Sequence, residues 1–264
     1  IQNNIIMSFI LAEQKGNVLI LKLNRPDKFN SFNRDMALQL IAELDRAAHD
    51  KSIRALVLTG EGKAFCAGQD LGEAIDPNGP GIKRIVEEHY NPIILKIRHL
   101  EKPVIAAVNG VAAGAGANIA LACDMVFVGK SASFIQAFSK IGLIPDSGGT
   151  FTLPRLVGFN MASALMITGD KVTSDEAIQY GMAYKQFADA DLLSQALVNA
   201  QHVAAMPTKA IGLTKKLLNR TYSNTLEQQL EMERDVQVES ANSYDYSEGV
   251  KAFLEKRKAE FKGE

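Results

Sequence analysis

The distribution of apolar and polar residues predicts short strands separated by helices. Phe9–Glu13 and Val18–Asn24 are apolar-rich runs joined by Lys15-Gly16-Asn17, a pattern typical of a β-hairpin. Arg54–Thr59 predicts a further short strand. Asn33 is suited to cap a helix between these strands. The apolar residues of that predicted helix recur at helical spacing, and they are Met36, Leu40, Ile41, Leu44, Ala47 and Ala48.

The middle of the chain continues the alternation. Ile82–Leu100 is expected to be helical, with a break or kink at Pro92. Lys102–Val108 and Met125–Val128 predict buried strands, and a helix is expected to end at Gly158.

The last third of the sequence predicts helices almost throughout, beginning near Phe159, with Pro207 dividing the final part into short pieces. Strands alternating with helices, followed by a run of helices, indicate an α/β core with a helical C-terminal region. We place the core with its active site at residues 7–200 and the helical region at 201–264. Such short terminal helices often pack against a neighbouring subunit.

Composition limits the classes of function. The 264 residues are 47% hydrophobic, enough for one large domain or a domain with an appendage. A net charge of −1 gives no general attraction to nucleic acid or to an anionic membrane. No apolar run approaches the roughly 18–20 residues of a spanning helix, and no secretory signal is visible. We expect a cytoplasmic protein, in which the residues before Met7 are an expression remnant or an upstream extension.

The most informative segment is Lys102–Asp124, KPVIAAVNGVAAGAGANIALACD. A buried strand is followed by a run of Ala and Gly that becomes a helix ending near Cys123. Small residues at a helix start leave its first amide groups reachable, and such an end attracts negative charge. Close packing of two backbones would give a similar composition. The dinucleotide motif GxGxxG fails here because Ile119 occupies its last glycine position, and no GxxxxGK[ST] motif is present.

Three groups suggest a reaction centre. Gly68 lets the chain turn and exposes the amide of Gln69, and the amide of Ala115 lies early in the Gly-rich helix. Two backbone donors converging on one oxygen would form an oxyanion hole. Asp146, at the start of a Gly-Gly helix, could then move a proton as base and acid. Asp is also a favoured N-cap, so capping is the alternative role of Asp146.

Other chemistries are poorly supported. None of the four His residues is paired with Cys or carboxylate at metal-ligand spacing, so no metal is expected. Cys66 lies beside the first turn but lacks a local base, and a small buried thiol is the simpler interpretation. Ser147 is not part of a GxSxG elbow.

Four segments in order resemble the enoyl-CoA hydratase/isomerase family, the crotonase superfamily. They are AFCAGQDL from Ala64, NGVAAGAGANIALACD from Asn109, IGLIPDSGGTFTLPRLVG from Ile141 and EGVKAFLEKRKAEF from Glu248. The resemblance implies a crotonase-like spiral of ββα turns with a C-terminal helical trimerisation region, in a homotrimer or a dimer of trimers. It implies an acyl-CoA substrate, with coenzyme A entering as part of the substrate and no separate cofactor.

The resemblance also assigns the site. The thioester oxygen would accept hydrogen bonds from the amides of Gln69 and Ala115. Lys28, and Lys256 from a neighbouring chain, would approach the CoA phosphates, and Ala64 and Phe253 would border the adenine. The remaining implied substrate or CoA contacts are Ala67, Gly68, Asp70, Leu71, Gly72, Gly114, Asn118 and Phe138.

The departures from the family pattern concern the reaction. Hydratases of the family carry two catalytic Glu where this chain has Asn118 and Phe138, and commonly Gly where it has Asp146. Without those carboxylates, efficient hydration is not expected. The pattern LIPDSGG with VAAGAGAN is similar to isomerases of the phenylacetate pathway, which implies a double-bond shift or the opening of a ring epoxide beside the thioester.

Three other functions stay open: a hydratase of fatty-acid or aromatic degradation, a non-catalytic acyl-CoA-binding subunit, and, more remotely, an NAD(P)-binding domain. Several apolar side chains could shape the acyl pocket, although core packing would explain them equally well. They are Phe32, Ile75, Ile82, Phe138 and Phe151.

Overall fold

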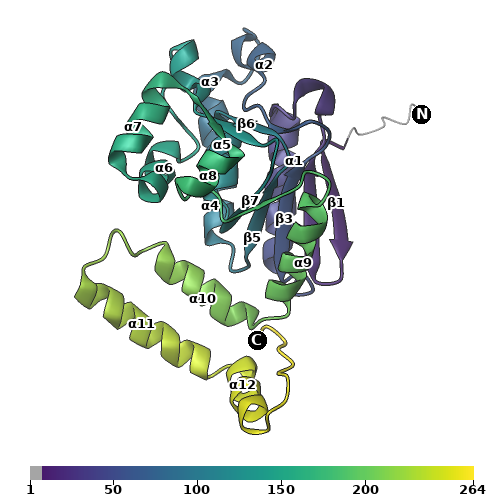
Figure 1. Ribbon diagram of the computed structural model, residues 1–264, viewed down its shortest axis with the longest axis vertical. Helices are drawn as coiled ribbons and strands as arrows, with labels where there is room; N and C mark the ends of the chain where they lie inside the picture. The colour runs from purple at the N-terminus through teal and green to yellow at the C-terminus, as the bar shows by residue number, and fades with distance from the viewer. Residues whose placement is uncertain (1–7) are drawn as a thin grey trace.

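The computed structural model describes residues 8–264, so the interpretation of the first six residues lies outside the described part of the chain. A six-stranded sheet with the order β1-β2-β3-β5-β7-β10 forms the centre of the molecule (Figure 1). β1 and β2 form the predicted antiparallel hairpin, and every other pair in this sheet is parallel. The strands are β1 (Ile10–Lys15), β2 (Val18–Leu23), β3 (Ala55–Gly60), β5 (Val104–Val108), β7 (Met125–Gly129) and β10 (Lys185–Phe187).

A second, smaller sheet has the order β4-β6-β8-β9. Its strands are β4 (Ala64–Cys66), β6 (Val111–Ala113), β8 (Ser133–Ile135) and β9 (Lys171–Thr173). Three times in succession, a strand of the large sheet is followed by a strand of the small sheet: β3 by β4, β5 by β6, and β7 by β8. Helical segments complete these turns, which confirms the predicted crotonase-like ββα spiral.

Helices surround the two sheets. Those of the spiral are α1 (Arg34–His49), α2 (Leu71–Ile75), α3 (Gly81–Arg84), α4 (Asn91–His99), α5 (Ala115–Ala122), α6 (Gly149–Val157), α7 (Phe159–Thr168), α8 (Ser174–Gln179) and α9 (Leu192–Ala204). Short helical turns are η1 (Pro26–Lys28), η2 (Ile85–Tyr90) and η3 (Ala137–Ile141). Asn33 caps α1 as predicted, because its side chain accepts a hydrogen bond from the amide of Met36.

The predicted irregularity at Pro92 takes the form of a π-helical turn rather than a break. η2 is that turn, and it leads directly into α4, in which Pro92 lies in the first turn. The amide of Asn91 donates to the carbonyl of Val86, five residues earlier. Widening the helix in this way accommodates a residue that has no amide hydrogen.

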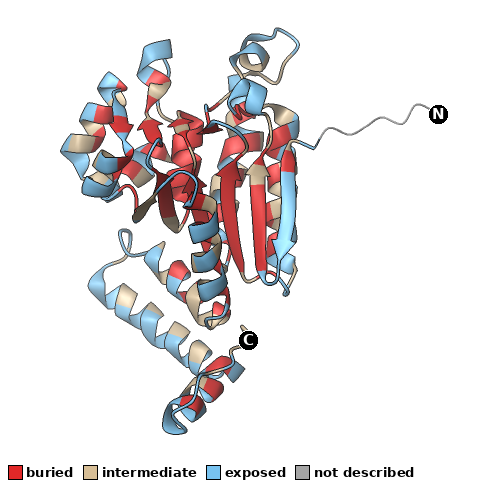
Figure 2. Ribbon diagram, turned by 45° about the vertical axis from the view of Figure 1, so that its right-hand side comes forward, coloured by how far each residue is buried: buried red, intermediate tan, exposed pale blue. Residues whose placement is uncertain are grey.

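The inner strands β2, β3, β5 and β7 of the large sheet are buried, as the red strands in Figure 2 show, whereas the edge strand β1 is mostly exposed. In β2, Leu19, Leu21 and Leu23 pack into the main core, whereas Val18 and Ile20 pack into a second cluster that includes side chains of α9. Alternate side chains of a strand point to opposite faces, so a strand covered on both sides is apolar throughout. This explains the continuous apolar runs in the sequence.

Five short strands were not predicted, namely β4, β6, β8, β9 and β10. β6 lies inside the Ala/Gly run, and β9 and β10 lie in the part expected to be helical. Each has only three residues and pairs with strands distant in sequence: β9 with β8, and β10 with β7. Their pairing partners, rather than local periodicity, determine their conformation.

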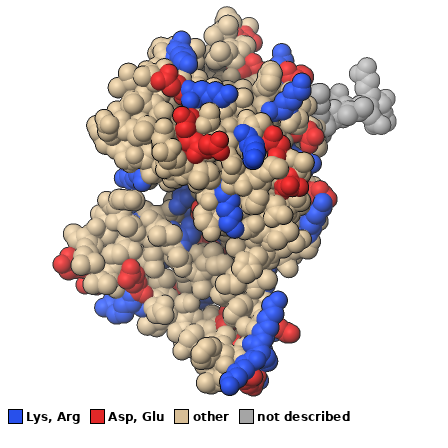
Figure 3. Space-filling model, viewed as in Figure 1, with Lys and Arg blue, Asp and Glu red and all other residues tan. Residues whose placement is uncertain are grey.

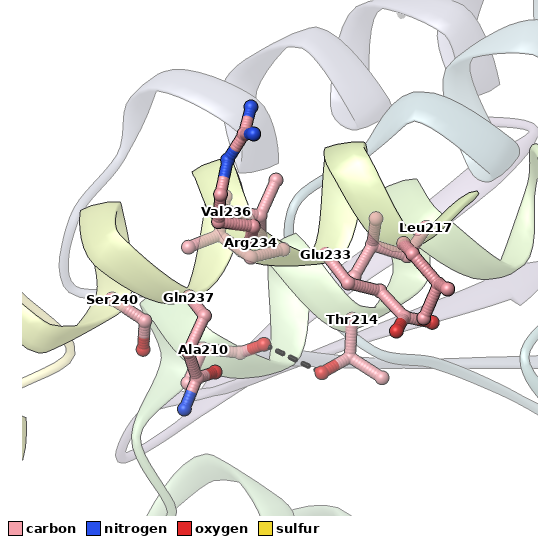
Figure 4. Close-up of a pocket in the computed structure, with 10 residues that line it drawn as sticks. Ala210, Thr214, Leu217, Glu233, Arg234, Val236, Gln237 and Ser240 are labelled. Carbon is pink, nitrogen blue, oxygen red and sulfur yellow. Dashed lines mark hydrogen bonds between the residues drawn. The ribbon is translucent and has the colours of Figure 1, made fainter. Parts of the chain in front are cut away.

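The C-terminal helices α10 (Thr208–Leu218), α11 (Leu226–Ala241) and α12 (Tyr244–Leu254) extend below the sheets (Figure 1). Pro207 separates α9 from α10, as predicted. α11 buries none of its 16 residues within the single chain. A groove of about 500 Å³ between α10 and α11 is lined by residues such as Leu217, Val236 and Gln237 (Figure 4). The predicted division at residue 200 falls within α9 and stays a prediction.

Charge is mixed over the surface. On the face shown in Figure 3, Lys and Arg side chains are interspersed with Asp and Glu. Among the helices of residues 8–264, none is long and apolar enough to cross a membrane.

Candidate active site

The first element of the site is the turn that follows β4. Gly68 has φ +95°, a backbone conformation that favours glycine. The amide of Phe32 donates to the Gly68 carbonyl (2.7 Å), and the amide of Asp70 donates to the Phe32 carbonyl (2.8 Å). The amide of Gln69, between these two bonds, donates to no acceptor within residues 8–264. The turn therefore offers one fixed backbone donor.

The second element is the start of α5. Gly114 precedes the helix with φ +52° and ψ −127°, a backbone conformation that residues other than glycine rarely adopt. The amide of Ala115 is in the first turn, whose donors have no intrahelical acceptor. A Cβ on Gly116 would lie only 2.3 Å from the Cys66 carbonyl oxygen, so glycine at this position lets α5 approach β4 closely. Close backbone packing and amides without an intrahelical acceptor are thus both present, and the packing brings the helix start to the first turn.

The two backbone donors are brought together by this approach. A Cβ on Gly68 would lie 3.6 Å from the backbone nitrogen of Ala115 and 3.0 Å from the carbonyl oxygen of Ala113. The turn carrying Gln69 therefore touches the start of α5. Neighbouring backbone amides of this kind can bind an oxygen that becomes negatively charged during a reaction.

Asp146 forms the third element, in the loop before α6. The N-cap of α6 is Gly148, and no side chain makes a capping hydrogen bond there, so the capping interpretation of Asp146 is wrong. Its half-buried carboxylate instead accepts a hydrogen bond from the Ser147 hydroxyl (Oγ to Oδ1, 2.8 Å). Ser147 adopts φ +51°, an unfavourable backbone conformation for a residue with a side chain. Such strain is concentrated at functional sites.

Burial raises the pKa of Asp146, and the hydrogen bond from Ser147 opposes this effect only in part. From the sequence, either the nearby helix N-terminus or an apolar environment could have dominated the pKa of Asp146; in the structure the effect of burial is the larger one. A carboxylate with a raised pKa is a stronger base than a fully hydrated one. Asp146 is therefore suited to accept a proton.

α5 also holds the Asp146 loop. Asn118 lies one turn after Ala115, and its Nδ2 donates to the main-chain carbonyl of Asp146 (2.8 Å). The Asn118 Oδ1 accepts a hydrogen bond from Nε2 of Gln136 (2.9 Å). The same short helix thus carries the Ala115 amide at its start and holds the Asp146 loop through Asn118. The predicted contact of Asn118 with substrate stays a prediction.

Two aromatic residues lie beside these groups. A Cβ on Gly114 would lie 3.8 Å from Cζ of Phe138, so the buried ring of Phe138 packs next to the start of α5. The hydroxyl of Tyr90, in η2, donates to Oε1 of Gln69 (2.8 Å). Burial is the main cause of a strong rise in the pKa of Tyr90, and the charge of Asp146 is a smaller one. Tyr90 is therefore attached to the first turn through the side chain of Gln69.

The other predicted contacts are distributed around the first turn. Lys28, Ala67, Leu71 and Gly72 are exposed, and Ala64 is buried in β4. Their contacts with CoA stay predictions.

Three further predicted contacts have other surroundings. Asp70 caps α2 by accepting from the Gly72 amide, and it forms an ion pair with Arg25 (2.9 Å). Phe253 and Lys256 lie in and just after α12, which is at the opposite end of the molecule from α5 and α6 (Figure 1). They do not join this site within one chain, so only the neighbouring copy invoked in the prediction could bring them there.

The proposed apolar pocket is only partly explained by core packing. Phe32 and Phe138 are buried, but Ile75, Ile82 and Phe151 are 80%, 48% and 57% exposed. Packing within one chain therefore does not account for the last three.

Competing chemistries lack the necessary groups. Cys66 is buried, and burial raises the pKa of its thiol to about 12, which confirms that it is an unreactive core residue. Within residues 8–264, no group of three or more His, Cys, Asp or Glu side chains could hold a metal ion.

Gln136, Ser147 and Tyr90 were missed as site residues in the sequence. Ser147 is adjacent to Asp146 and could have been suspected from its position. Gln136 and Tyr90 belong to no motif, and only the fold brings them to the site.

The ββα spiral, with two neighbouring backbone amides at the turn after β4 and the start of α5, is the arrangement expected of the crotonase superfamily. A family model described as enoyl-CoA hydratase/isomerase matches residues 13–264. The chain therefore belongs to the enoyl-CoA hydratase/isomerase family and is an enzyme of the crotonase superfamily.

Individual relatives include both isomerases and hydratases. The chain is 46% identical to the 1,2-epoxyphenylacetyl-CoA isomerase of Escherichia coli (strain K12), over 97% of this chain and 99% of the relative. It is 35% identical to the 2,3-dehydroadipyl-CoA hydratase of the same strain, over 97% of this chain and 100% of that protein. Among solved structures, an enoyl-CoA hydratase from Bacillus anthracis superposes with a TM-score of 0.91 at 32% identity, covering 97% of this chain and 100% of that one.

Proposed function

We propose that the protein is an acyl-CoA isomerase that relocates a double bond, or opens a ring epoxide, next to the CoA thioester. The observation that carries the proposal is the half-buried carboxylate of Asp146, whose loop is tied to the helix that also presents the Ala115 amide. The similarity to the epoxyphenylacetyl-CoA isomerase supports the same class of substrate.

In the proposed reaction, the thioester oxygen accepts hydrogen bonds from the amides of Gln69 and Ala115. These bonds stabilise the negative charge that forms on the oxygen when a proton leaves the adjacent carbon. For a 3-enoyl thioester, the Asp146 carboxylate takes a proton from carbon 2, and the electron pair delocalises into a dienolate. The protonated Asp146 then returns the proton to carbon 4, giving the conjugated 2-enoyl thioester with no net gain or loss of atoms.

The surroundings of Asp146 favour proton transfer over hydration. Hydration requires groups that activate water and deliver a proton to carbon. Asn118 is a neutral amide engaged with two protein partners, and Phe138 places an apolar ring by the start of α5. The raised pKa of Asp146 helps it to accept the proton and return it within one catalytic cycle.

Replacing Asp146 by Asn tests the proposal, because the amide preserves the shape but cannot act as a base. Isomerase turnover should fall by at least about 100-fold, within the usual range for loss of a general base. Binding of a CoA thioester, measured by isothermal titration calorimetry, should persist. Turnover within threefold of wild type would contradict the assignment of Asp146.

The substrate assays should separate the alternatives. Conversion of a 3-enoyl-CoA without hydration of crotonyl-CoA supports the isomerase, whereas the opposite result supports a hydratase. Binding of several CoA thioesters without turnover of any would indicate a non-catalytic subunit. Proton NMR in deuterated water would show which carbon exchanges hydrogen.

We also propose that several copies of the chain associate, as a homotrimer or a dimer of trimers. The helix α11 supports this, because it buries no residue within one chain although Leu226, Leu230 and Val238 are 69%, 55% and 58% exposed. An apolar helix surface of this kind is typical of a subunit interface. Analytical ultracentrifugation would test it, and a monomer at micromolar concentration would contradict it.

A further inference from the structure

Two buried side chains form consecutive hydrogen bonds that end at the main-chain carbonyl of Asp146, the residue of the proposed base. Gln136 donates from Nε2 to Oδ1 of Asn118 (2.9 Å), and Asn118 donates from Nδ2 to the Asp146 carbonyl (2.8 Å). Gln136 is 3% exposed and Asn118 is 1% exposed. Water therefore does not compete for these two bonds.

The orientation of each amide is determined by its neighbour. The Asp146 carbonyl can only accept, so Asn118 must present its NH₂ group to it. Oδ1 of Asn118 then faces Gln136, which must in turn present its own NH₂ group. Reversing either amide would place two acceptors, or two donors, against each other. The hydrogen bonds from Gln136 to the Asp146 loop are therefore compatible with only one orientation of each amide.

Two further observations indicate that this arrangement is not ordinary core packing. Oε1 of Gln136 is buried and has no hydrogen-bond partner within residues 8–264. An apolar side chain would avoid the cost of that unsatisfied acceptor. In addition, a Cβ on Gly149 would lie 2.4 Å from Nδ2 of Asn118, so the glycine at the start of α6 leaves space for this amide.

We propose that Gln136 and Asn118 are positioning residues that hold the Asp146 carboxylate over the oxyanion donors. This inference rests on the proposed function of Asp146. The Asp146 carbonyl also accepts from the amide of Gly149 (2.8 Å), and this bond alone would leave the loop free to pivot about α6. The bond from Asn118 adds an attachment to α5, the helix that carries the Ala115 donor.

The test is a double-mutant cycle with side chains of similar size that cannot hydrogen bond. Asn118→Leu, Gln136→Met and the double variant should each be assayed for isomerisation of a 3-enoyl-CoA. We expect kcat to fall about tenfold in each single variant, with KM changed less than twofold, because the loss affects placement of the base rather than CoA binding. The double variant should lose no more than Asn118→Leu, since Gln136 acts only through Asn118.

A matched control is Gln186→Met. Gln186, in β10, also donates from its amide to polar groups, Ser174 and Asp175, but those have no bond to Asp146. Its kcat should equal that of wild type. If Asn118→Leu does not fold, Gln136→Met alone tests the positioning role. In that variant, amide hydrogen exchange of residues 141–157 should accelerate and kcat should fall.

The outcomes separate this inference from the function on which it rests. If Asp146→Asn is inactive but both single variants keep kcat within twofold of wild type, the positioning role is wrong and the base assignment stands. Losses that multiply in the double variant, or that appear mainly in KM, would also overturn the positioning role. If Asp146→Asn is active, the proposed function itself fails.

Discussion

Replacing Gly116 by Ala should separate the two backbone donors without removing any functional group. The added Cβ would lie 2.3 Å from the Cys66 carbonyl oxygen and 2.7 Å from Cβ and Sγ of the same residue. Ordinary contacts begin at 3.4 Å, so α5 must move away from β4 by about 1 Å. This movement shifts the Ala115 amide relative to the turn that carries Gln69.

A displacement of about 1 Å in a catalytic group can cost 100-fold in rate, and the loss of one oxyanion donor costs about 100- to 1,000-fold in kcat. We therefore expect kcat for a 3-enoyl-CoA to fall about 100-fold in Gly116→Ala. Overpacking should also lower the free energy of unfolding by about 1–3 kcal/mol. The assay follows the absorbance of the conjugated 2-enoyl thioester, and denaturant unfolding measures the stability.

The matched control is Gly249→Ala, inside α12. A Cβ there would meet only the ring of Phe261, at an ordinary distance of 3.4 Å. This variant should keep its kcat and gain up to about 1 kcal/mol from helix propensity. The reasoning about the oxyanion donors would be refuted if a folded Gly116→Ala variant kept kcat within threefold of wild type, because the donors would then tolerate separation.

Three further outcomes follow from charge and burial. Because burial raises the pKa of Asp146, and its ionised form is the base, kcat/KM should fall as the pH is lowered, with a midpoint above the ordinary aspartate value of 3.8; a midpoint at or below that value in a pH–rate profile would contradict this. When the pKa of a carboxyl is higher in the folded state than in the unfolded state, its ionisation destabilises the folded protein by about 1.4 kcal/mol per unit of pKa difference once the pH exceeds both values. Asp146→Asn removes this effect, so the variant should melt at a higher temperature than wild type at pH 7 but not at pH 3. Lys215 is 5% exposed and donates to Asp124 (2.7 Å) and to the carbonyl of Ile97 (2.7 Å), so Lys215→Met should lower the free energy of unfolding by about 3 kcal/mol. Arg234 is exposed on α11, so Arg234→Met should change the free energy of unfolding by less than about 0.5 kcal/mol. Equal effects of the two substitutions in urea unfolding would refute this difference.

The parts of the fold that the sequence predicted are those with a strong local signal. The helix after Asn33 combines a capping side chain with six apolar residues at helical spacing, and the structure has that helix as α1. The strand β5 is a continuous apolar run, because both faces of the large sheet are covered. Local pattern and tertiary packing demand the same conformation at these positions, so either one is sufficient to predict it.

The strands β6, β9 and β10 carry no such signal. A three-residue segment has too few positions to show a period of two, and each of these strands is determined by pairing with a distant partner. Pairing between β6 and β4 also brings the start of α5 to the turn after β4. The meeting of the two proposed oxyanion segments is therefore a consequence of sheet pairing, which the local glycine and alanine pattern could suggest but could not determine.

The same distinction applies to the residues of the site. Asp146 was identified as a candidate from its position before Gly148-Gly149, yet the sequence allowed it to be either a cap or a base. The decision depends on the loop conformation, in which the Ser147 hydroxyl binds the carboxylate, and on a contact across the fold from Asn118 of α5 to the main-chain carbonyl. Gln136 was not identified at all, because an isolated glutamine has no characteristic spacing.

The two amides that hold the Asp146 loop are neutral, and this has a chemical consequence. A carboxylate in either amide position would add a negative charge near the base and would compete with it for protons. Asn118 and Gln136 supply directional hydrogen bonds without that charge, so the proton taken by Asp146 has no neighbouring acceptor in this chain of hydrogen bonds to which it could pass. Returning it to another carbon of the same substrate is then the available route, so product formed in deuterated water should carry protium rather than deuterium at the carbon that receives the proton.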